Sequence, residues 1–111
     1  QMSDFLYVKD AVAMTIHLAN TPTANGLFNL GSGQANTWNT LATAIFAALD
    51  LEPNIKYVEM PEQLKGKYQY YTCADTAKLR STGYADEGYT LQDSVKDYVQ
   101  NYLVTGKQLG Q

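Results

Sequence analysis

The segment DFLYVKDAV (residues 4–12) starts with a short apolar run and passes directly into residues that are spaced for a helix. Apolar and small side chains continue at one helical face, at positions 8, 11, 12, 15, 16 and 19. This spacing predicts a helix over residues 9–20. The turn-forming residues 20–26 then predict a loop.

A second segment, GLFNLGSG (residues 26–33), follows this loop. Its nearly continuous apolar run predicts a strand over residues 26–30 that is covered on both faces. Gly31 and Gly33 predict a tight turn that needs a positive φ. Thr37 or Asn36 can then cap a helix, and the apolar stripe of that helix contains residues 38, 41, 42, 45, 46 and 49.

The rest of the chain adds one strand and two helices to the prediction. Residues 54–60 alternate as a strand does, and Pro61 can open a short turn through Leu64. TCAD (residues 72–75) predicts a short helix to about residue 81, and TLQD (residues 90–93) predicts a final helix. The resulting class is α/β, with about three short strands and four helices. So few strands leave sheet edges unpaired, which indicates that a larger sheet is missing from this chain. The unpaired edges predict an apolar patch or self-association.

Composition excludes several functions. The net charge of −3 and the pI near 4.9 argue against nonspecific binding to nucleic acid, which requires positive charge. No apolar run approaches the ~20 residues that cross a bilayer, and no signal peptide is visible. The single cysteine, Cys73, allows no internal disulfide and fits a reducing, cytoplasmic setting. We expect Cys73 to be at least half-buried and His17, the single histidine, to be exposed.

Two catalytic patterns of dehydrogenases are missing from the chain. None of the nine tyrosines has a lysine four residues later, the arrangement that lowers a tyrosine pKa for proton exchange. The turn at Gly31 and Gly33 lacks the third glycine of a dinucleotide fingerprint, because Asn36 stands there. We therefore expect no catalytic residue, no cofactor site and no metal site in these 111 residues.

The best candidate for a binding site is LKGKYQYY (residues 64–71). Lys65 and Lys67 suit a pyrophosphate, and the Tyr68 hydroxyl can orient a sugar or phosphate. On chemistry alone, a solvated basic loop packed by tyrosines fits the same residues.

Taken together, the segments at residues 4–12, 26–33 and 61–69, with TCAD and LRSTGY (residues 79–84), resemble the C-terminal third of the ADP-glyceromanno-heptose 6-epimerases. These enzymes belong to the extended short-chain dehydrogenases. The resemblance implies the substrate-binding portion of a Rossmann-type fold, a single domain over residues 1–111. It implies that NADP is bound by an N-terminal Rossmann domain outside this chain, that the substrate is an ADP-sugar, and that the parent is a homo-oligomer.

The resemblance also assigns residues. Tyr68 corresponds to the family tyrosine that contacts the nucleotide sugar, with Lys65 and Lys67 beside it. Ser3 stands where the family usually has a substrate-binding arginine. The fragment alone should be inactive, while the whole enzyme would supply heptose for lipopolysaccharide. Two alternatives stay open: a stand-alone binding or interaction domain, and a related epimerase or dehydratase acting on another nucleotide sugar.

Overall fold

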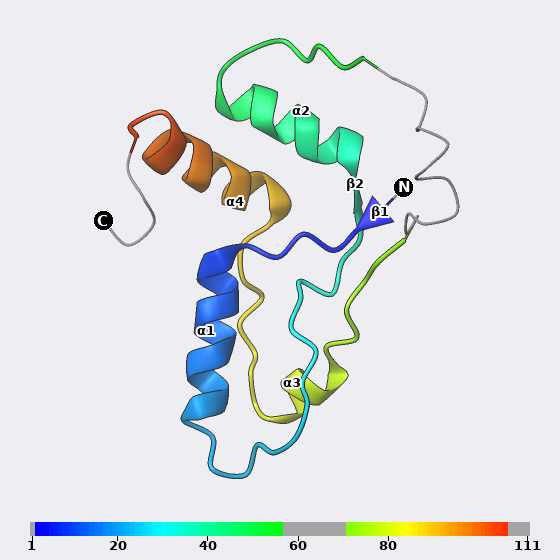
Figure 1. Ribbon diagram of the computed structural model, residues 1–111, viewed down its shortest axis with the longest axis vertical. Coiled ribbons are helices and arrows are strands. Elements are labelled where there is room, and N and C mark those ends of the chain that lie inside the picture. The colour runs from blue at the N-terminus through cyan, green and yellow to red at the C-terminus, as the bar shows by residue number, and fades with distance from the viewer. Residues whose placement is uncertain (1, 57–70, 107–111) are drawn as a thin grey trace, which may run out of the picture.

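The computed structural model describes residues 2–56 and 71–106. These residues form a mixed α/β arrangement (Figure 1), with α2 and α4 at one end, α1 and α3 at the other, and the strands between them. The elements in chain order are β1 (Met2–Ser3), α1 (Val8–Ala19), β2 (Asn36–Thr37), α2 (Trp38–Ala48), α3 (Ala77–Ser81), α4 (Leu91–Tyr98) and the π-helical turn η2 (Val99–Leu103).

Three of the helices confirm the predictions. α1 lies where the first helix was expected, and α2 and α4 begin after the expected threonines. The Thr37 hydroxyl accepts a hydrogen bond from the Thr40 backbone N–H at 3.0 Å, and the Thr90 hydroxyl does the same for Asp93 at 3.1 Å. Each threonine thus satisfies one of the backbone donors that a helix start leaves unpaired.

The start of the short third helix was predicted too early. α3 begins at Ala77, so residues 72–75 do not form its first turn. The Asp75 carboxylate instead accepts from the Ala77 backbone N–H at 3.0 Å. At the other end Gly83 has φ +95° and donates to the Arg80 carbonyl at 3.0 Å, which confirms the predicted glycine stop.

The strand predicted at residues 26–30 is wrong. The segment has alternating burial, with Leu27 92% exposed and Phe28 and Leu30 half-buried, but it belongs to no sheet. The sheet that the structure does describe is antiparallel and pairs Met2 with Thr37 and Ser3 with Asn36. An extended segment becomes a strand only with a neighbour to bond to, and the described residues supply none for this one. The other predicted strand is not formed over residues 54–56, and residues 57–60 and the turn at 61–64 lie outside the described residues.

The core is thin. Met14, Leu79 and Tyr84 form its buried centre, and four half-buried side chains pack against it: Leu6, Leu18, Phe28 and Leu30. The accessible surface of 8007 Å² exceeds the roughly 6,100 Å² expected of a compact monomer of 12.3 kDa. The radius of gyration of 16.5 Å likewise exceeds the roughly 13 Å of a compact domain of about 100 residues.

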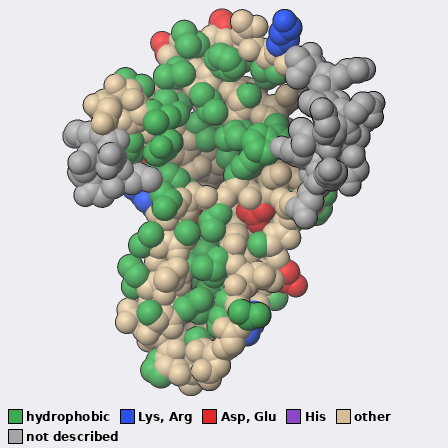
Figure 2. Space-filling view, in the orientation of Figure 1, with side chains coloured by type: hydrophobic (Ala, Val, Ile, Leu, Met, Phe, Trp, Pro, Cys, Tyr) green, Lys and Arg blue, Asp and Glu red, His purple; other side chains and the backbone are tan. Residues whose placement is uncertain are grey.

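The apolar stripe of α1 is largely exposed. Val8, Val12 and Ile16 are 43%, 51% and 55% exposed, while Asp10 and Met14 on another face are buried. Hydrophobic side chains are accordingly visible at the end of the molecule that holds α1 and α3 (Figure 2). This exposed α1 face, defined by Val8, Val12 and Ile16, is an apolar patch on a helix rather than at the sheet edge from which the sequence predicted one.

Two further expectations are wrong. Cys73 is exposed rather than buried. His17 is only partly accessible, because its Nε2 lies 2.9 Å from the Thr82 hydroxyl and its ring meets Tyr84 edge-on at 5.1 Å. Both partners of His17 lie in the loop after α3, some 65 residues away in sequence.

Candidate functional site

Ser3 lies in the middle of a small extended layer. On one side β1 pairs with β2, and on the other side Met2 forms a parallel bridge with Tyr71, where the Thr72 N–H donates to the Met2 carbonyl at 2.9 Å. The half-buried Ser3 therefore lies beside the residues that directly follow the predicted binding segment. Lys65, Lys67 and Tyr68 themselves lie outside the described residues, so their assignment stays a prediction.

Asp4 follows Ser3 and joins three distant parts of the chain. Its carboxylate accepts hydrogen bonds from the Ser32 N–H (2.9 Å), the Ser32 hydroxyl (2.6 Å), the Gly33 N–H (3.0 Å) and the Ala74 N–H (3.0 Å). The Asp4 N–H in turn donates to the Thr72 hydroxyl at 3.2 Å. One side chain thus fixes the turn before β2 and the segment that pairs with β1.

These hydrogen bonds determine the charge state of Asp4. Partial burial alone would raise its pKa, but the hydrogen bonds from Ser32, Ala74 and Gly33 stabilise the carboxylate more strongly. The pKa of Asp4 is therefore lowered from its usual value, and the residue is ionised at neutral pH.

The glycine turn is structural in this chain. Gly33 has φ +77°, which confirms the predicted positive φ, and a Cβ on Gly31 would lie 2.4 Å from the Ala74 Cβ and 2.7 Å from an Asp4 carboxylate oxygen. Because the N–H groups of Ser32 and Gly33 already donate to Asp4, they are not free for a phosphate. The turn does not fit the pyrophosphate of a dinucleotide.

A second polar cluster ties the start of α1 to α4. The Asp97 carboxylate accepts from the Tyr7 hydroxyl at 2.5 Å, the Lys9 ammonium at 2.7 Å and the Asn101 amide at 2.7 Å. The hydrogen bonds from Lys9, Tyr7 and Asn101 lower the pKa of Asp97 to about 2. Burial and the bond to Asp97 raise the pKa of Tyr7, while the bonds to Asp97 and Tyr102 raise that of Lys9.

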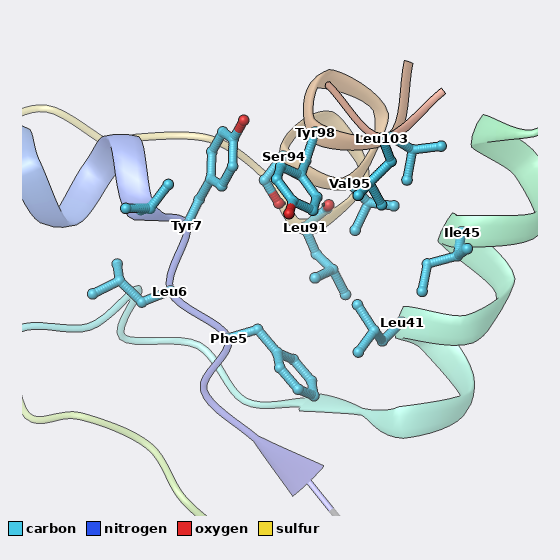
Figure 3. A pocket seen from close by; sticks show the side chains of 12 residues that line it. Phe5, Leu6, Tyr7, Leu41, Ile45, Leu91, Ser94, Val95, Tyr98 and Leu103 are labelled. Carbon is cyan, nitrogen blue, oxygen red and sulfur yellow. Dashed lines mark hydrogen bonds between the residues drawn. The ribbon is translucent and has the colours of Figure 1, made fainter. Parts of the chain in front are cut away.

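An apolar cavity of about 430 Å³ lies next to this cluster. Figure 3 shows Leu41 and Ile45 of α2 facing Leu91 and Val95 of α4, with Phe5 below them. The complete lining is Phe5, Leu6, Tyr7, Val8, Leu41, Ile45, Leu91, Ser94, Val95, Tyr98, Val99 and Leu103. It carries no acidic or basic side chain, so it does not suit a charged nucleotide.

The sequence did not indicate that the carboxylates of Asp4 and Asp97 would each accept several hydrogen bonds from distant residues. Asp10 is likewise buried, and its carboxylate accepts from the Tyr89 N–H at 3.0 Å. Within residues 2–56 and 71–106, no group of three or more His, Cys, Asp or Glu side chains is placed to hold a metal ion. No helix in this described part has the length and apolar character needed to cross a membrane.

Comparison with known proteins gives consistent relatives, although no family model matches the chain. The chain is 52% identical over 103 residues to the ADP-L-glycero-D-manno-heptose-6-epimerase of Nitratidesulfovibrio vulgaris Hildenborough, covering 93% of this chain and 32% of that protein. Proteins of the same name from Fusobacterium nucleatum and Pseudomonas aeruginosa are 42% and 36% identical over 109 and 111 residues. They cover 93% and 87% of this chain, which spans about a third of their lengths, in their C-terminal part.

Proposed function

Because this chain is homologous to the C-terminal part of the ADP-L-glycero-D-manno-heptose-6-epimerases, we propose that it forms the substrate-binding part of such an enzyme. The whole protein would be cytoplasmic and would use NADP to invert C6 of ADP-D-glycero-D-manno-heptose. Its product would supply heptose for lipopolysaccharide. The observation that carries the proposal is the 52% identity over 93% of the chain.

In this proposal Tyr68, Lys65 and Lys67 bind the ADP-sugar, and Ser3 lies at the same face. The position of Tyr71 supports this arrangement, because it forms a bridge with Met2, the neighbour of Ser3, only three residues after Tyr68 in sequence. The lysines would balance the pyrophosphate charge, and the Tyr68 hydroxyl would orient the nucleotide sugar.

The chain's own residues would bind and orient the substrate, while the redox chemistry comes from elsewhere. NADP, when bound, supplies a hydride acceptor and donor for transient oxidation at C6. The glycine turn at residues 31–33 does not fit NADP, because Asp4 occupies its N–H groups. We therefore assign NADP binding to the N-terminal part of the whole protein.

A chimera tests the function directly. The 111-residue chain replaces the corresponding third of the Nitratidesulfovibrio relative, and epimerisation of ADP-D-glycero-D-manno-heptose is followed by chromatographic separation of the two epimers. We expect turnover by the chimera and none by the isolated chain, because the chain has no tyrosine followed four residues later by lysine.

The test variant is Tyr68→Phe, which removes only the proposed substrate hydroxyl. The matched control is Tyr89→Phe, whose ring packs edge-on against Tyr7 at 5.0 Å. We expect a higher KM for Tyr68→Phe and an unchanged KM for Tyr89→Phe. A chimera that folds and binds NADP but leaves ADP-heptose unchanged would refute the proposed function. Turnover by the isolated chain would instead refute the assignment of the redox chemistry to the rest of the protein.

A further inference from the structure

We infer that Asp4 is a positioning residue for the nucleotide-sugar face of the protein. Its carboxylate holds β1, the turn at Ser32 and Gly33, and the segment at Thr72–Ala74 in one arrangement. The inference rests on the proposed function, because it assigns a role in substrate binding to a residue that is not itself assigned a contact with substrate.

Asp4 connects three segments that are far apart in the sequence. Ser3 and Asp4 are consecutive, so the backbone that presents Ser3 is anchored by the next side chain. The segment after the predicted binding residues is held at successive points, since Thr72 bonds to Met2 and Asp4 and Ala74 bonds to Asp4. Loosening Asp4 would therefore let both sides of the proposed binding face move.

The hydrogen bonds of Asp4 require an ionised carboxylate. All four partners of the carboxylate are N–H or O–H donors, and the described residues contain no ion pair to Asp4. An asparagine has the same shape, but its NH₂ group would point at N–H donors and could not accept from them. The site therefore requires a carboxylate, and the small space beside Gly31 leaves little room for a longer one.

Asp4 lies outside the hydrophobic core. It belongs neither to the buried core of Met14, Leu79 and Tyr84 nor to the half-buried side chains that pack against it. Its bonds instead connect extended segments at the candidate face. We therefore expect its loss to disturb substrate binding more than the folded fraction.

The test compares Asp4→Asn, Asp4→Glu and the control Asp86→Asn in the chimera. Asp86 is exposed and its carboxylate accepts only the local Gly88 N–H among the described hydrogen bonds. For Asp4→Asn we expect KM for ADP-heptose to rise roughly tenfold, the loss of about one charge-assisted hydrogen bond, with kcat nearly unchanged. Asp4→Glu should fall between the wild type and Asp4→Asn, and Asp86→Asn should leave KM unchanged.

A second measurement does not depend on activity. Amide hydrogen exchange in the 111-residue chain should become faster at Ser32, Gly33 and Ala74 in Asp4→Asn, and stay the same at Met14 and Leu79. Faster exchange with an unchanged KM would overturn the inference, because Asp4 would then support the fold alone. A wild-type chimera without turnover would reject the proposed function instead, whatever the exchange result.

Discussion

Ser3 provides a small neutral side chain where the related epimerases are expected to carry an arginine. The residue is half-buried in β1 and faces Asn36 across the strand pair. In the chimera, Ser3→Arg should lower the KM for ADP-heptose by roughly tenfold, because a guanidinium can pair with the pyrophosphate through two hydrogen bonds. Steady-state kinetics across substrate concentrations measure the change.

The matched control for this substitution is Met2→Arg. Neighbouring strand residues point to opposite faces, so this variant adds the same charge on the other side of β1. It should leave KM unchanged. An equal fall in KM in both variants would mean that added charge, rather than its position at Ser3, attracts the substrate.

Tyr84 has a buried hydroxyl that makes no hydrogen bond to any described residue. A buried polar group without a partner costs free energy, so Tyr84→Phe should raise the free energy of unfolding by about 1 kcal/mol. Urea denaturation followed by circular dichroism measures this. Tyr7→Phe is the contrasting control, because its hydroxyl donates to Asp97, and it should lower stability. A loss of stability in Tyr84→Phe would show that its hydroxyl has a partner in solution.

Single residues were predictable from sequence only when their partners are close along the chain. The caps Thr37 and Thr90 bond to residues three positions later, so a short motif contains the whole interaction. Asp4 bonds to residues 28 to 70 positions away, and Asp97 bonds to Tyr7 across 90 positions. No local pattern contains both partners of such bonds, and so the sequence did not indicate them.

The secondary-structure elements follow the same rule. α1, α2 and α4 carry their apolar spacing within themselves, α2 and α4 also carry their threonine caps, and the structure confirms all three helices. A strand depends on its neighbour, and the apolar run at residues 26–30 could not show that the described chain supplies no partner for it. The spacing along α1 likewise identifies an apolar stripe but not the surface that will cover it.

The joint between α1 and α4 should be sensitive to acid. The pKa of Asp97 is lowered from 3.8 to about 2, so the stability it contributes is present above pH 4 and is lost as the pH falls towards 2. Asp97→Asn should therefore be less stable at neutral pH and should lose less stability over this acidic range. Denaturant unfolding of the 111-residue chain at several pH values measures both effects.

Some acid dependence should remain in that variant, because the pKa of Asp4 is also lowered. Glu87→Gln is the control, since Glu87 is exposed and makes no ion pair in the described part of the chain. It should unfold in acid like the wild type. If Asp97→Asn kept the full wild-type loss between pH 4 and pH 2, the cluster of Tyr7, Lys9 and Asp97 would not link the two helices.

The 111-residue chain combines a thin core with many exposed hydrophobic side chains. Its accessible area is well above that of a compact monomer of equal mass, and it spans about a third of its relatives. In the proposed enzyme, the remaining two thirds of the protein would include the surface that packs on the exposed α1 face. The isolated chain would leave that face in water.

The isolated chain should therefore self-associate through the exposed α1 face. Val12 lies at its centre and is 51% exposed, so Val12→Lys should reduce the average mass in light scattering and weaken binding of a hydrophobic dye without lowering helix content. Asn54→Lys adds the same charge at an exposed loop residue and should associate like the wild type. In the chimera, Val12→Lys should instead lower the free energy of unfolding, because there the lysine would face a covering surface. A monomeric wild-type chain that does not bind the dye would show that this face needs no partner.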